Sequence, residues 1–336
     1  MASVSAFLLT LLMAPVVIRW LTALKVGEQV RSADEMRGLA DYSRSKNGIP
    51  TMGGCLILFS LVGSVFLWGD LSNAQLILAA LVTAVFGAIG FSDDFLKLKN
   101  RQSKGLAARA KFLLQVGAGL AFILLVLRDP FYPATIEVPF LKEPAWNLGF
   151  WMIPFVVLVL VGASNAVNLA DGLDGLAVGC TTMIALTLTV MSYLTGHHEM
   201  ARYLLIPYIP GAGELTVFCA ALVGACLGFL WYNSPPANVF MGDTGSLALG
   251  GAIGAVAVLI KKEILLALIG GIFVAEALSV IFQVASFQLT GRRIFLMAPI
   301  HHHFQLKGWP ESKVTIRFWI IGGVLALLSL STLKLR

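Results

Sequence analysis

The chain has 336 residues, of which 58% are hydrophobic and only 12% are charged, and its formal net charge is +6. Soluble domains carry about 25% charged residues, so this composition excludes an ordinary soluble protein and predicts an α-helical protein of the lipid bilayer. In a membrane protein an excess of positive charge indicates first which side of the membrane each connection occupies. We therefore expect no nucleic-acid partner.

Ten apolar stretches have about the length that a helix needs to cross a bilayer. They cover residues 3–24, 51–68, 74–91, 106–127, 150–168, 175–195, 215–232, 245–260, 264–289 and 315–333. Pro15 and Arg19 interrupt the first stretch where a signal-peptide cleavage site would fall, so we expect a retained span. The pattern predicts an all-α polytopic membrane protein of about ten transmembrane helices, folded as one domain over residues 1–336.

Positive charge is unevenly divided between the two sets of connections. The connections that follow the odd-numbered stretches, with the adjoining helix ends, hold 17 of the 24 lysines and arginines. By the positive-inside rule these connections are cytoplasmic and both termini are extracytoplasmic. On the opposite face, the alternating segment ATIEVPFLKE within 128–149 predicts a short β-hairpin.

Polar motifs gather in the cytoplasmic connections. Asp93 and Asp94 stand side by side where the third apolar stretch ends, although adjacent carboxylates repel each other and a helix end has no need of two. The five motifs are SRSKNGIPTMGG, SDDFLK, NAVNLADGLDGL, WYNSPPANVFMGDTGS and MAPIHHHFQLKGW. Chance would scatter such motifs over both faces, so their convergence predicts an active site at the cytoplasmic membrane surface.

Four polar residues recur every three positions in NAVNLADGLDGL. Asn165, Asn168, Asp171 and Asp174 would be neighbours along one flank of a helix that runs into a tight, glycine-containing loop. Helix capping is the alternative interpretation, but capping needs one or two such residues. Four polar groups at membrane depth are costly without a ligand, so we favour a binding role.

Asp243 and three consecutive histidines carry the remaining chemistry. Asp243 lies between two glycines just before an apolar helix, where Thr244 or Ser246 could provide the cap and leave the carboxylate for a metal ion or a phosphate. Consecutive helical residues point about 100° apart, so we expect a loop that presents these histidines to different parts of an anionic substrate. The carboxylates suit Mg²⁺, and the set as a whole indicates phosphoryl transfer. The histidines are His301, His302 and His303.

Two further polar residues lie within the ninth apolar stretch. Glu276 and Gln283 are seven positions apart and so share a helix face. We favour a buried polar contact between helices over a direct role in the reaction.

The motifs SDDFLK, NLADGLDGL, WYNSPPANVFMGDTGS and APIHHHFQLKGW together resemble the phospho-N-acetylmuramoyl-pentapeptide transferase family, one of the polyprenyl-phosphate N-acetylhexosamine-1-phosphate transferases. The resemblance covers essentially the whole chain. It implies Mg²⁺-dependent transfer of phospho-MurNAc-pentapeptide from UDP-MurNAc-pentapeptide to undecaprenyl phosphate, giving lipid I and UMP. It also implies a multi-pass protein of the bacterial inner membrane with its active site facing the cytoplasm, and it is compatible with a homodimer.

The resemblance also implies roles for individual residues. Asp93 and Asp94 match the aspartate pair of the family, and Asp243 matches its principal Mg²⁺ carboxylate. The triple histidine matches as well, and one departure is that Arg109 stands where some relatives have lysine, which keeps the charge but not the hydrogen-bond geometry. The positions that match the nucleotide pocket and its phosphate side are Asn168, Asp171, Asp174, Asn233, Phe240, Lys46 and Lys97.

We expect the acceptor phosphate to attack the sugar-side phosphorus of the donor directly, with Asp93 removing any remaining proton or orienting that phosphate. Asp94 would assist Asp93 or help to position the metal, and Asp174 and Phe240 would hold the uracil. A two-step reaction through a phospho-enzyme is the mechanistic alternative. A UDP-GlcNAc-dependent sister enzyme and an anion transporter are the rival functions. Transport is disfavoured because the charged motifs lie at one surface and the sequence shows no repeat.

Overall fold

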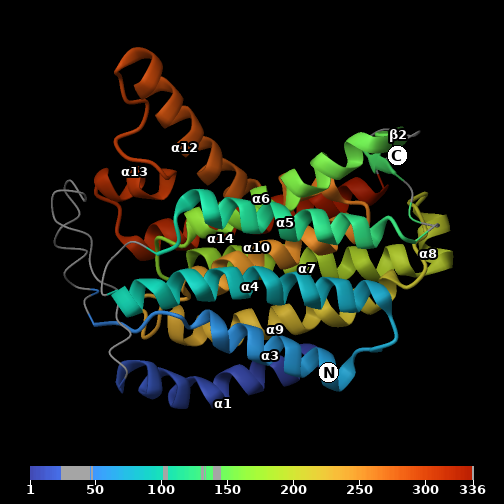
Figure 1. The fold of residues 1–336 in the computed structure, drawn as a ribbon, viewed down its shortest axis with the longest axis horizontal. Coiled ribbons are helices and arrows are strands. Elements are labelled where there is room, and N and C mark those ends of the chain that lie inside the picture. The colour runs from blue at the N-terminus through green and yellow to red at the C-terminus, as the bar shows by residue number, and fades with distance from the viewer. Residues whose placement is uncertain are drawn as a thin grey trace.

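The structure is a computed structural model that describes residues 1–23, 46, 48–100, 105–129, 132, 134–138 and 145–334. In these ranges nine helices are long and apolar enough to cross a membrane, and a tenth, shorter apolar helix accompanies them. Figure 1 shows these helices side by side in one bundle. The predicted all-α polytopic fold is confirmed.

The described helices follow the predicted apolar stretches closely. The long apolar helices are α1 (Ala2–Ala23), α4 (Ala74–Asn100), α5 (Ala108–Val126), α6 (Met152–Ala170), α7 (Leu176–Gly196), α9 (Leu215–Asn233), α10 (Gly242–Leu259), α12 (Gly271–Thr290) and α14 (Glu311–Ser331), and the shorter apolar helix is α3 (Gly54–Trp68). The remaining short elements are α8 (His198–Tyr203), α11 (Glu263–Ile269), α13 (Ile300–Leu306), the 3₁₀ turns at 149–151, 212–214 and 332–334, and the strands β1 (Thr135–Glu137) and β2 (Ala145–Asn147).

Helix α4 continues beyond the predicted end of its apolar stretch. The prediction of a connection over 92–105 is wrong at its start, because the helix runs to Asn100 and carries both Asp93 and Asp94. An ion pair between Asp93 and Lys97, one helical turn apart, supports this extension. Residues 101–104 lie outside the described residues, as does the predicted connection over 25–50 apart from Lys46 and residues 48–50.

Two other predicted boundaries are corrected. The single span predicted over 264–289 is divided at Gly270 into α11 and α12. The predicted connection 290–314 contains α13, so the three histidines lie on a short helix and the loop interpretation is wrong. Glycine favours a helix break, which explains the division at Gly270. Prolines at positions 299 and 310 lie on either side of α13 and limit its length.

Helix α10 forms the centre of the bundle. Every residue from Thr244 to Leu259 is buried, and the helix packs against α4, α6, α3 and α7. Its sequence is rich in glycine and alanine, which lets the neighbouring backbones approach closely. This burial fixes the N-terminal turn of α10, which carries Asp243, beside α4.

The contact between α4 and α10 depends on Gly90. A methyl group at Gly90 would overlap the carbonyl oxygen of Asp243, whereas Gly117 on α5 has no neighbour within 4 Å of such a methyl group. We therefore expect Gly90→Ala to destabilise the protein by about 1–3 kcal/mol through overpacking and to lower its unfolding temperature in detergent. Gly117→Ala is the matched control, and an equal effect of the two substitutions would contradict this account.

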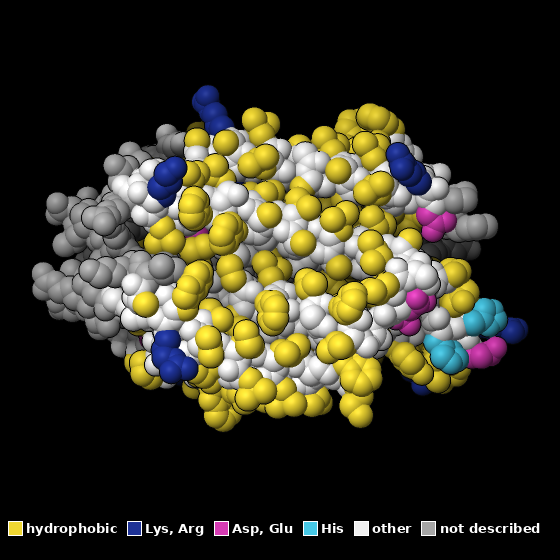
Figure 2. Space-filling view, turned by 60° about the horizontal axis from the view of Figure 1, so that its bottom comes forward, with side chains coloured by type: hydrophobic (Ala, Val, Ile, Leu, Met, Phe, Trp, Pro, Cys, Tyr) yellow, Lys and Arg dark blue, Asp and Glu magenta, His cyan; other side chains and the backbone are white. Residues whose placement is uncertain are grey.

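Both chain ends lie at one end of the bundle, opposite α13 and the C-terminal end of α4 (Figure 1). This arrangement agrees with an even number of membrane crossings. Hydrophobic side chains cover the middle of the face in Figure 2, and charged side chains lie mainly toward its two ends. Such a surface suits a bilayer, while the cytoplasmic assignment of either end stays a prediction.

A short hairpin lies at the end of the bundle that carries the termini. β1 pairs antiparallel with β2, with Ile136 opposite Trp146, so the predicted hairpin is present although its second strand lies just beyond the ATIEVPFLKE segment. Lys262 forms an ion pair with Glu137, and Lys261 Nζ donates to the Thr135 carbonyl oxygen at 3.1 Å. These two lysines are buried and anchor the hairpin to the end of α10.

Candidate active site

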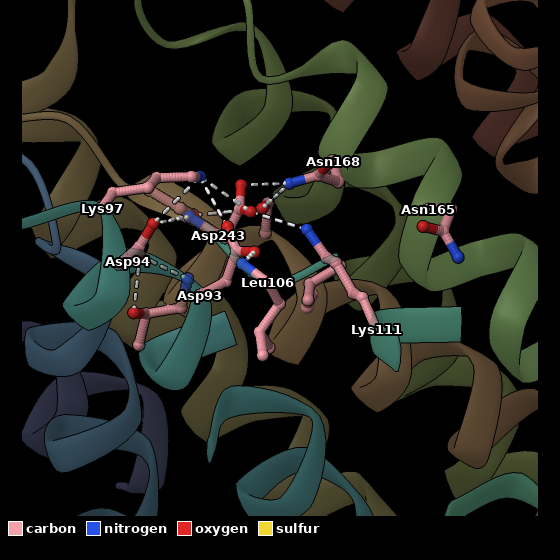
Figure 3. Close-up of polar contacts among 12 residues, drawn as sticks. Asp93, Asp94, Lys97, Leu106, Lys111, Asn165, Asn168 and Asp243 are labelled. Carbon is pink, nitrogen blue, oxygen red and sulfur yellow. Dashed lines mark hydrogen bonds and ion pairs between the residues drawn. The ribbon is translucent and has the colours of Figure 1, made fainter. Parts of the chain in front are cut away.

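Three carboxylates from two helices meet at the end of the bundle opposite the termini. Asp93 and Asp94 extend from α4, and Asp243 extends from the first turn of α10. One oxygen from each residue lies within 4.8 Å of the others, and both α4 carboxylates are only 3% exposed (Figure 3). Like charges at this separation repel strongly in a partly dry environment, so the group requires cations.

Two lysines supply positive charge to the carboxylates. Lys97 Nζ lies 2.6 Å from Asp93 Oδ2, 3.1 Å from Asp243 Oδ2 and 3.6 Å from Asp94 Oδ1. Lys111 Nζ, from α5, lies 2.6 Å from the same Asp243 oxygen. Figure 3 shows the two lysines approaching Asp243 from different sides.

Lys111 is a site residue that the sequence analysis did not single out, since it directed attention to Arg109 instead. Residues two apart on a helix point about 200° apart, so only one of them can face the carboxylates. Arg109 is exposed, and Lys111 makes the contact. The helical phase of α5 could have indicated a choice between them, but the partner lies 132 residues away along the chain.

Asp94 is bound to the N-terminal turn of α10. Its Oδ1 accepts from the backbone N–H of Asp243 at 3.2 Å, and its Oδ2 accepts from the Thr244 N–H at 2.9 Å and the Thr244 hydroxyl at 2.8 Å. The carboxylate therefore accepts from helix N–H groups that have no acceptor within α10. Its negative charge is also stabilised by the positive N-terminal end of the helix dipole. This contact positions Asp243.

Asp93 has other partners than Asp94, and its side chain meets α10 at the Asp243 side chain. Its Oδ1 accepts from the backbone N–H of Leu106 at 2.8 Å, and its Oδ2 faces Lys97. The two adjacent aspartates therefore have different environments, which the sequence did not distinguish.

The polar stripe in NAVNLADGLDGL is divided by the structure. Asn168 donates to Asp243 Oδ1 and to the Ser246 hydroxyl, both at 2.8 Å, and so joins the carboxylate group. Asn165 instead donates to Gln115 and to a backbone carbonyl of its own helix, and Figure 3 shows it apart from the carboxylates. The helix ends at Ala170 and a tight turn follows, as predicted.

That turn leads into a second polar group, which we call the Lys46 cluster and which consists of Lys46, Asp174, Asn233, Phe240 and Glu311. Lys46 forms ion pairs with Asp174 and, at 2.7 Å, with Glu311. Its Nζ also lies 5.5 Å from the centre of the Phe240 ring. Glu311 begins α14 and was not recognised from the sequence, because nothing in its local pattern distinguishes it from an ordinary residue of a first helical turn.

Backbone hydrogen bonds fix the geometry of the Lys46 cluster. Asp174 Oδ2 accepts from the Ala237 N–H at 3.0 Å, and Asn233 Oδ1 accepts from the Gly175 N–H at 3.1 Å. The Asn233 amide donates to the Val239 carbonyl at 2.8 Å. The turn after α6 and the segment before α10 are thereby joined, while Asp171 occupies the C-terminal cap of α6.

The three histidines of α13 point to different partners. His301 is fully buried, with Nδ1 3.1 Å from a Glu276 oxygen, and His302 Nδ1 lies 2.7 Å from Gln305 Oε1. His303 Nδ1 accepts from the Leu296 N–H at 3.1 Å. Burial, followed by the charge of Lys307, lowers the pKa of His303, which favours the neutral ring that this hydrogen bond requires.

The polar pair on α12 makes two separate contacts. Glu276 meets α13 through His301, as predicted for a buried contact between helices. Gln283 instead accepts from the N–H groups of Ile294 and Phe295 at 3.1 and 2.9 Å, which holds the segment before α13 against α12.

A cavity of about 760 Å³, lined by both apolar and polar side chains, lies between α12 and this segment. Its lining includes Val280, Val284, Phe287, Met297 and Leu306, with Gln283 and Arg293 as polar members.

The carboxylate group fits a hard divalent cation. Its donor set consists of carboxylate oxygens, the ligands that Mg²⁺ prefers, and it is close enough to share one ion. Among the described residues the group contains neither cysteine nor histidine, so its donor chemistry does not favour zinc.

A bilayer-spanning helical bundle with acidic and basic residues gathered at one end defines an integral-membrane enzyme of phosphoryl transfer. Residues 76–261 match the family described as glycosyl transferase family 4. The whole chain is similar to three proteins named phospho-N-acetylmuramoyl-pentapeptide-transferase, and each alignment covers 92% of the relative. They are those of Oleidesulfovibrio alaskensis (50% identical), Desulfotalea psychrophila (50%) and Thermodesulfovibrio yellowstonii (51%). The chain belongs to the phospho-N-acetylmuramoyl-pentapeptide transferase family, and the resemblance seen in its motifs is confirmed.

Lys111 offers a test of the site that is independent of the motifs. We expect Lys111→Met to lower kcat by about 10²-fold, because the substitution removes a fixed cation from a site where negative charge develops. Arg109→Met is the matched control on the exposed side of the same helix, and the rate of the transfer reaction is the measurement. A larger loss in the Arg109 variant than in the Lys111 variant would contradict the assignment.

Proposed function

We propose that this protein transfers phospho-MurNAc-pentapeptide from UDP-MurNAc-pentapeptide to undecaprenyl phosphate, with Mg²⁺, and so produces lipid I and UMP. The observation that carries the proposal is the grouping of three carboxylates and two lysines at one end of a membrane bundle, in a chain about half identical to transferases of that name. We further propose that this end faces the cytoplasm of a bacterial inner membrane, as the distribution of basic residues predicts. Assembly as a homodimer stays a prediction.

The reaction is a direct displacement at phosphorus. An oxygen of the acceptor phosphate forms a bond to the sugar-side phosphorus of the donor, the bond to the bridging oxygen breaks, and UMP departs with that electron pair. Asp93 orients the acceptor phosphate and takes up its remaining proton. Asp93 suits this role better than Asp94 because the oxygens of Asp94 already bind the first turn of α10.

The negative charge of two substrates must be neutralised at one place. Lys97 and Lys111 lie on the Asp243 carboxylate and can stabilise the diphosphate and the departing UMP. Asp243, with Asp93 or Asp94, would hold Mg²⁺, which supplies further neutralisation of phosphate charge when bound. Asn168 keeps Asp243 oriented through its hydrogen bond.

The Lys46 cluster is the proposed site of the nucleotide. Asp174 would accept from the uracil N–H and Phe240 would stack on the base, while Lys46 would contact the donor phosphates. Asn233 supports this site by holding the turn after α6. His302, His303 and Asp171 would line the donor side. His301 is fully buried and would support the turn after α6, and the contacts of Asn165 make it a supporting residue of the bundle.

The acceptor chain is proposed to leave the site along α12. Its phosphate must meet a water-soluble donor while its polyprenyl tail stays in the bilayer. The cavity beside α12 lies next to the segment that carries α13, and the apolar part of its lining, which includes Val280, Val284 and Phe287, supports such a path.

The test is an assay with purified protein, undecaprenyl phosphate, Mg²⁺ and each UDP-sugar in turn. We expect lipid I and UMP from UDP-MurNAc-pentapeptide, and no transfer from UDP-GlcNAc. Transfer from UDP-GlcNAc alone would reject the substrate assignment. A labelled covalent phospho-sugar enzyme, trapped without lipid acceptor, would reject the single displacement in favour of the two-step reaction.

A further inference from the structure

A buried carboxylate and a buried imidazole face each other between α12 and α13. Glu276 and His301 are both 0% exposed, and Glu276 Oε1 lies 3.1 Å from His301 Nδ1. Within the part of the chain that the structure describes, neither carboxylate oxygen of Glu276 and neither ring nitrogen of His301 has a hydrogen-bond partner. Unsatisfied buried polar groups cost about 1–3 kcal/mol each, so this pair calls for a physical reason.

The opposite edge of the His301 ring packs on the turn after α6. A methyl group added at Gly172 would overlap His301 Nε2, so the absence of a side chain at this position allows the ring to approach the backbone. Gly172 lies between Asp171 and Asp174 in sequence, and Asp174 belongs to the Lys46 cluster. His301 therefore joins α12 to the turn that carries two of the proposed donor-binding residues.

We propose that Glu276 is a positioning residue for donor binding: it holds the His301 ring, and that ring holds the turn at 171–174 through Gly172. The 3.1 Å contact of Nδ1 with the carboxylate, together with the close approach of Nε2 to Gly172, restricts the ring to one orientation between α12 and the turn. This inference rests on the proposed function, because that function assigns the turn to the nucleotide.

The separation of this pair from the carboxylate group determines which kinetic constant should change. The described ion pairs and side-chain hydrogen bonds of Asp93, Asp94 and Asp243 run to Lys97, Lys111, Asn168 and the backbone and hydroxyl groups near them. None of these contacts involves Glu276 or His301. Loss of Glu276 should consequently weaken donor binding and leave the chemical step nearly intact.

The test compares Glu276→Leu, Glu276→Gln and Ser279→Ala in the full-length protein. Leucine removes the polar contact to His301, and glutamine keeps an oxygen at the same position. Ser279 is a buried polar residue of α12 whose hydroxyl donates to the Glu276 backbone carbonyl oxygen at 2.7 Å. The measurements are Kd for UMP and for UDP-MurNAc-pentapeptide by titration calorimetry, and KM and kcat for transfer. We expect Glu276→Leu to raise the donor Kd and KM about tenfold with kcat within about twofold, and the other two variants to stay within about threefold of wild type.

Leucine at position 276 would leave the buried His301 unpaired, which could prevent folding. A double substitution provides a second test for that outcome. Glu276→Leu with His301→Leu replaces the polar pair by an apolar one, which buried sites tolerate better than a single unpaired partner. We expect this double variant to fold and to show the same tenfold loss of donor affinity as a single variant, because the two residues act as one unit.

Three outcomes would overturn the inference. One is unchanged donor Kd and KM in both the Leu variant and the double variant, and another is a fall in kcat without a change in KM. Both can occur while wild type binds UDP-MurNAc-pentapeptide and forms lipid I, so they leave the proposed function in place. The third is a wild-type protein that binds neither nucleotide, which would reject the proposed function and this inference together.

Discussion

Replacement of Asp243 by asparagine is expected to lower kcat by at least about 10³-fold at saturating donor and acceptor. The amide has nearly the same shape as the carboxylate, but it lacks the charge that a divalent cation requires, and it leaves Lys97 and Lys111 without their shared partner. Alanine at the same position should abolish Mg²⁺-dependent turnover. The measurement is release of UMP from UDP-MurNAc-pentapeptide across a titration of Mg²⁺.

The fold should survive these substitutions, because the Asp243 side chain takes no part in the core contacts of α10. The thermal unfolding temperature of the Asn variant in detergent should stay close to that of wild type. Asp70→Asn is the matched control, since Asp70 is an exposed aspartate in the loop before α4 and its substitution should leave turnover unchanged. Undiminished activity in the Asp243 variants, or a chelator-insensitive wild type, would contradict the metal role.

Hydropathy alone predicted the order and approximate extent of the apolar helices, because a membrane-crossing helix must satisfy its backbone polar groups internally along about 30 Å of hydrocarbon. Among the described residues nine of the ten predicted stretches contain a long helix, and the second contains the shorter α3. Hydropathy failed where polar residues continue a helix beyond the apolar stretch. The sequence analysis placed Asp93 and Lys97 in a connection between helices. In the structure they lie on successive turns of α4 and form an ion pair. The helix around His301 was missed for the same reason, since it lies outside any long apolar run.

Candidate site residues could be predicted where several polar or charged residues cluster in one sequence motif. They could not be predicted where a contact joins single residues that are far apart in the sequence. Asp243 was found from its glycine-rich surroundings, and the structure brings it to the aspartate pair. Lys111 and Glu311 were not found, because each makes its contact with a residue more than 100 positions away and lies in a locally unremarkable helical turn. Only the packing of α4, α5 and α10 determines which lysine reaches the carboxylates.

The two adjacent aspartates should respond differently to the same substitution. Asp93→Asn is expected to lower kcat by about 10³-fold with little change in thermal stability, because it removes the group proposed to orient and deprotonate the acceptor phosphate. Asp94→Asn should lower the unfolding temperature as well as kcat. It replaces a charged acceptor of three hydrogen bonds at the start of α10, and loss of such a cap costs about 0.5–2 kcal/mol.

The distinction rests on measuring both quantities for both variants. In the Asp94 variant Asp243 is displaced rather than removed, so we expect a smaller fall in kcat, about 10-fold to 10²-fold, accompanied by weaker Mg²⁺ dependence. Thr244→Val provides an independent check, because it removes one of the three bonds to Asp94 while leaving every carboxylate in place, and it should produce a milder form of the Asp94 effect. If Asp93→Asn destabilised the protein and Asp94→Asn did not, the two roles would have to be exchanged. Equal loss of kcat with unchanged stability in both would instead mean that the pair acts as one unit on the acceptor, and that the bonds to α10 do not restrict Asp94.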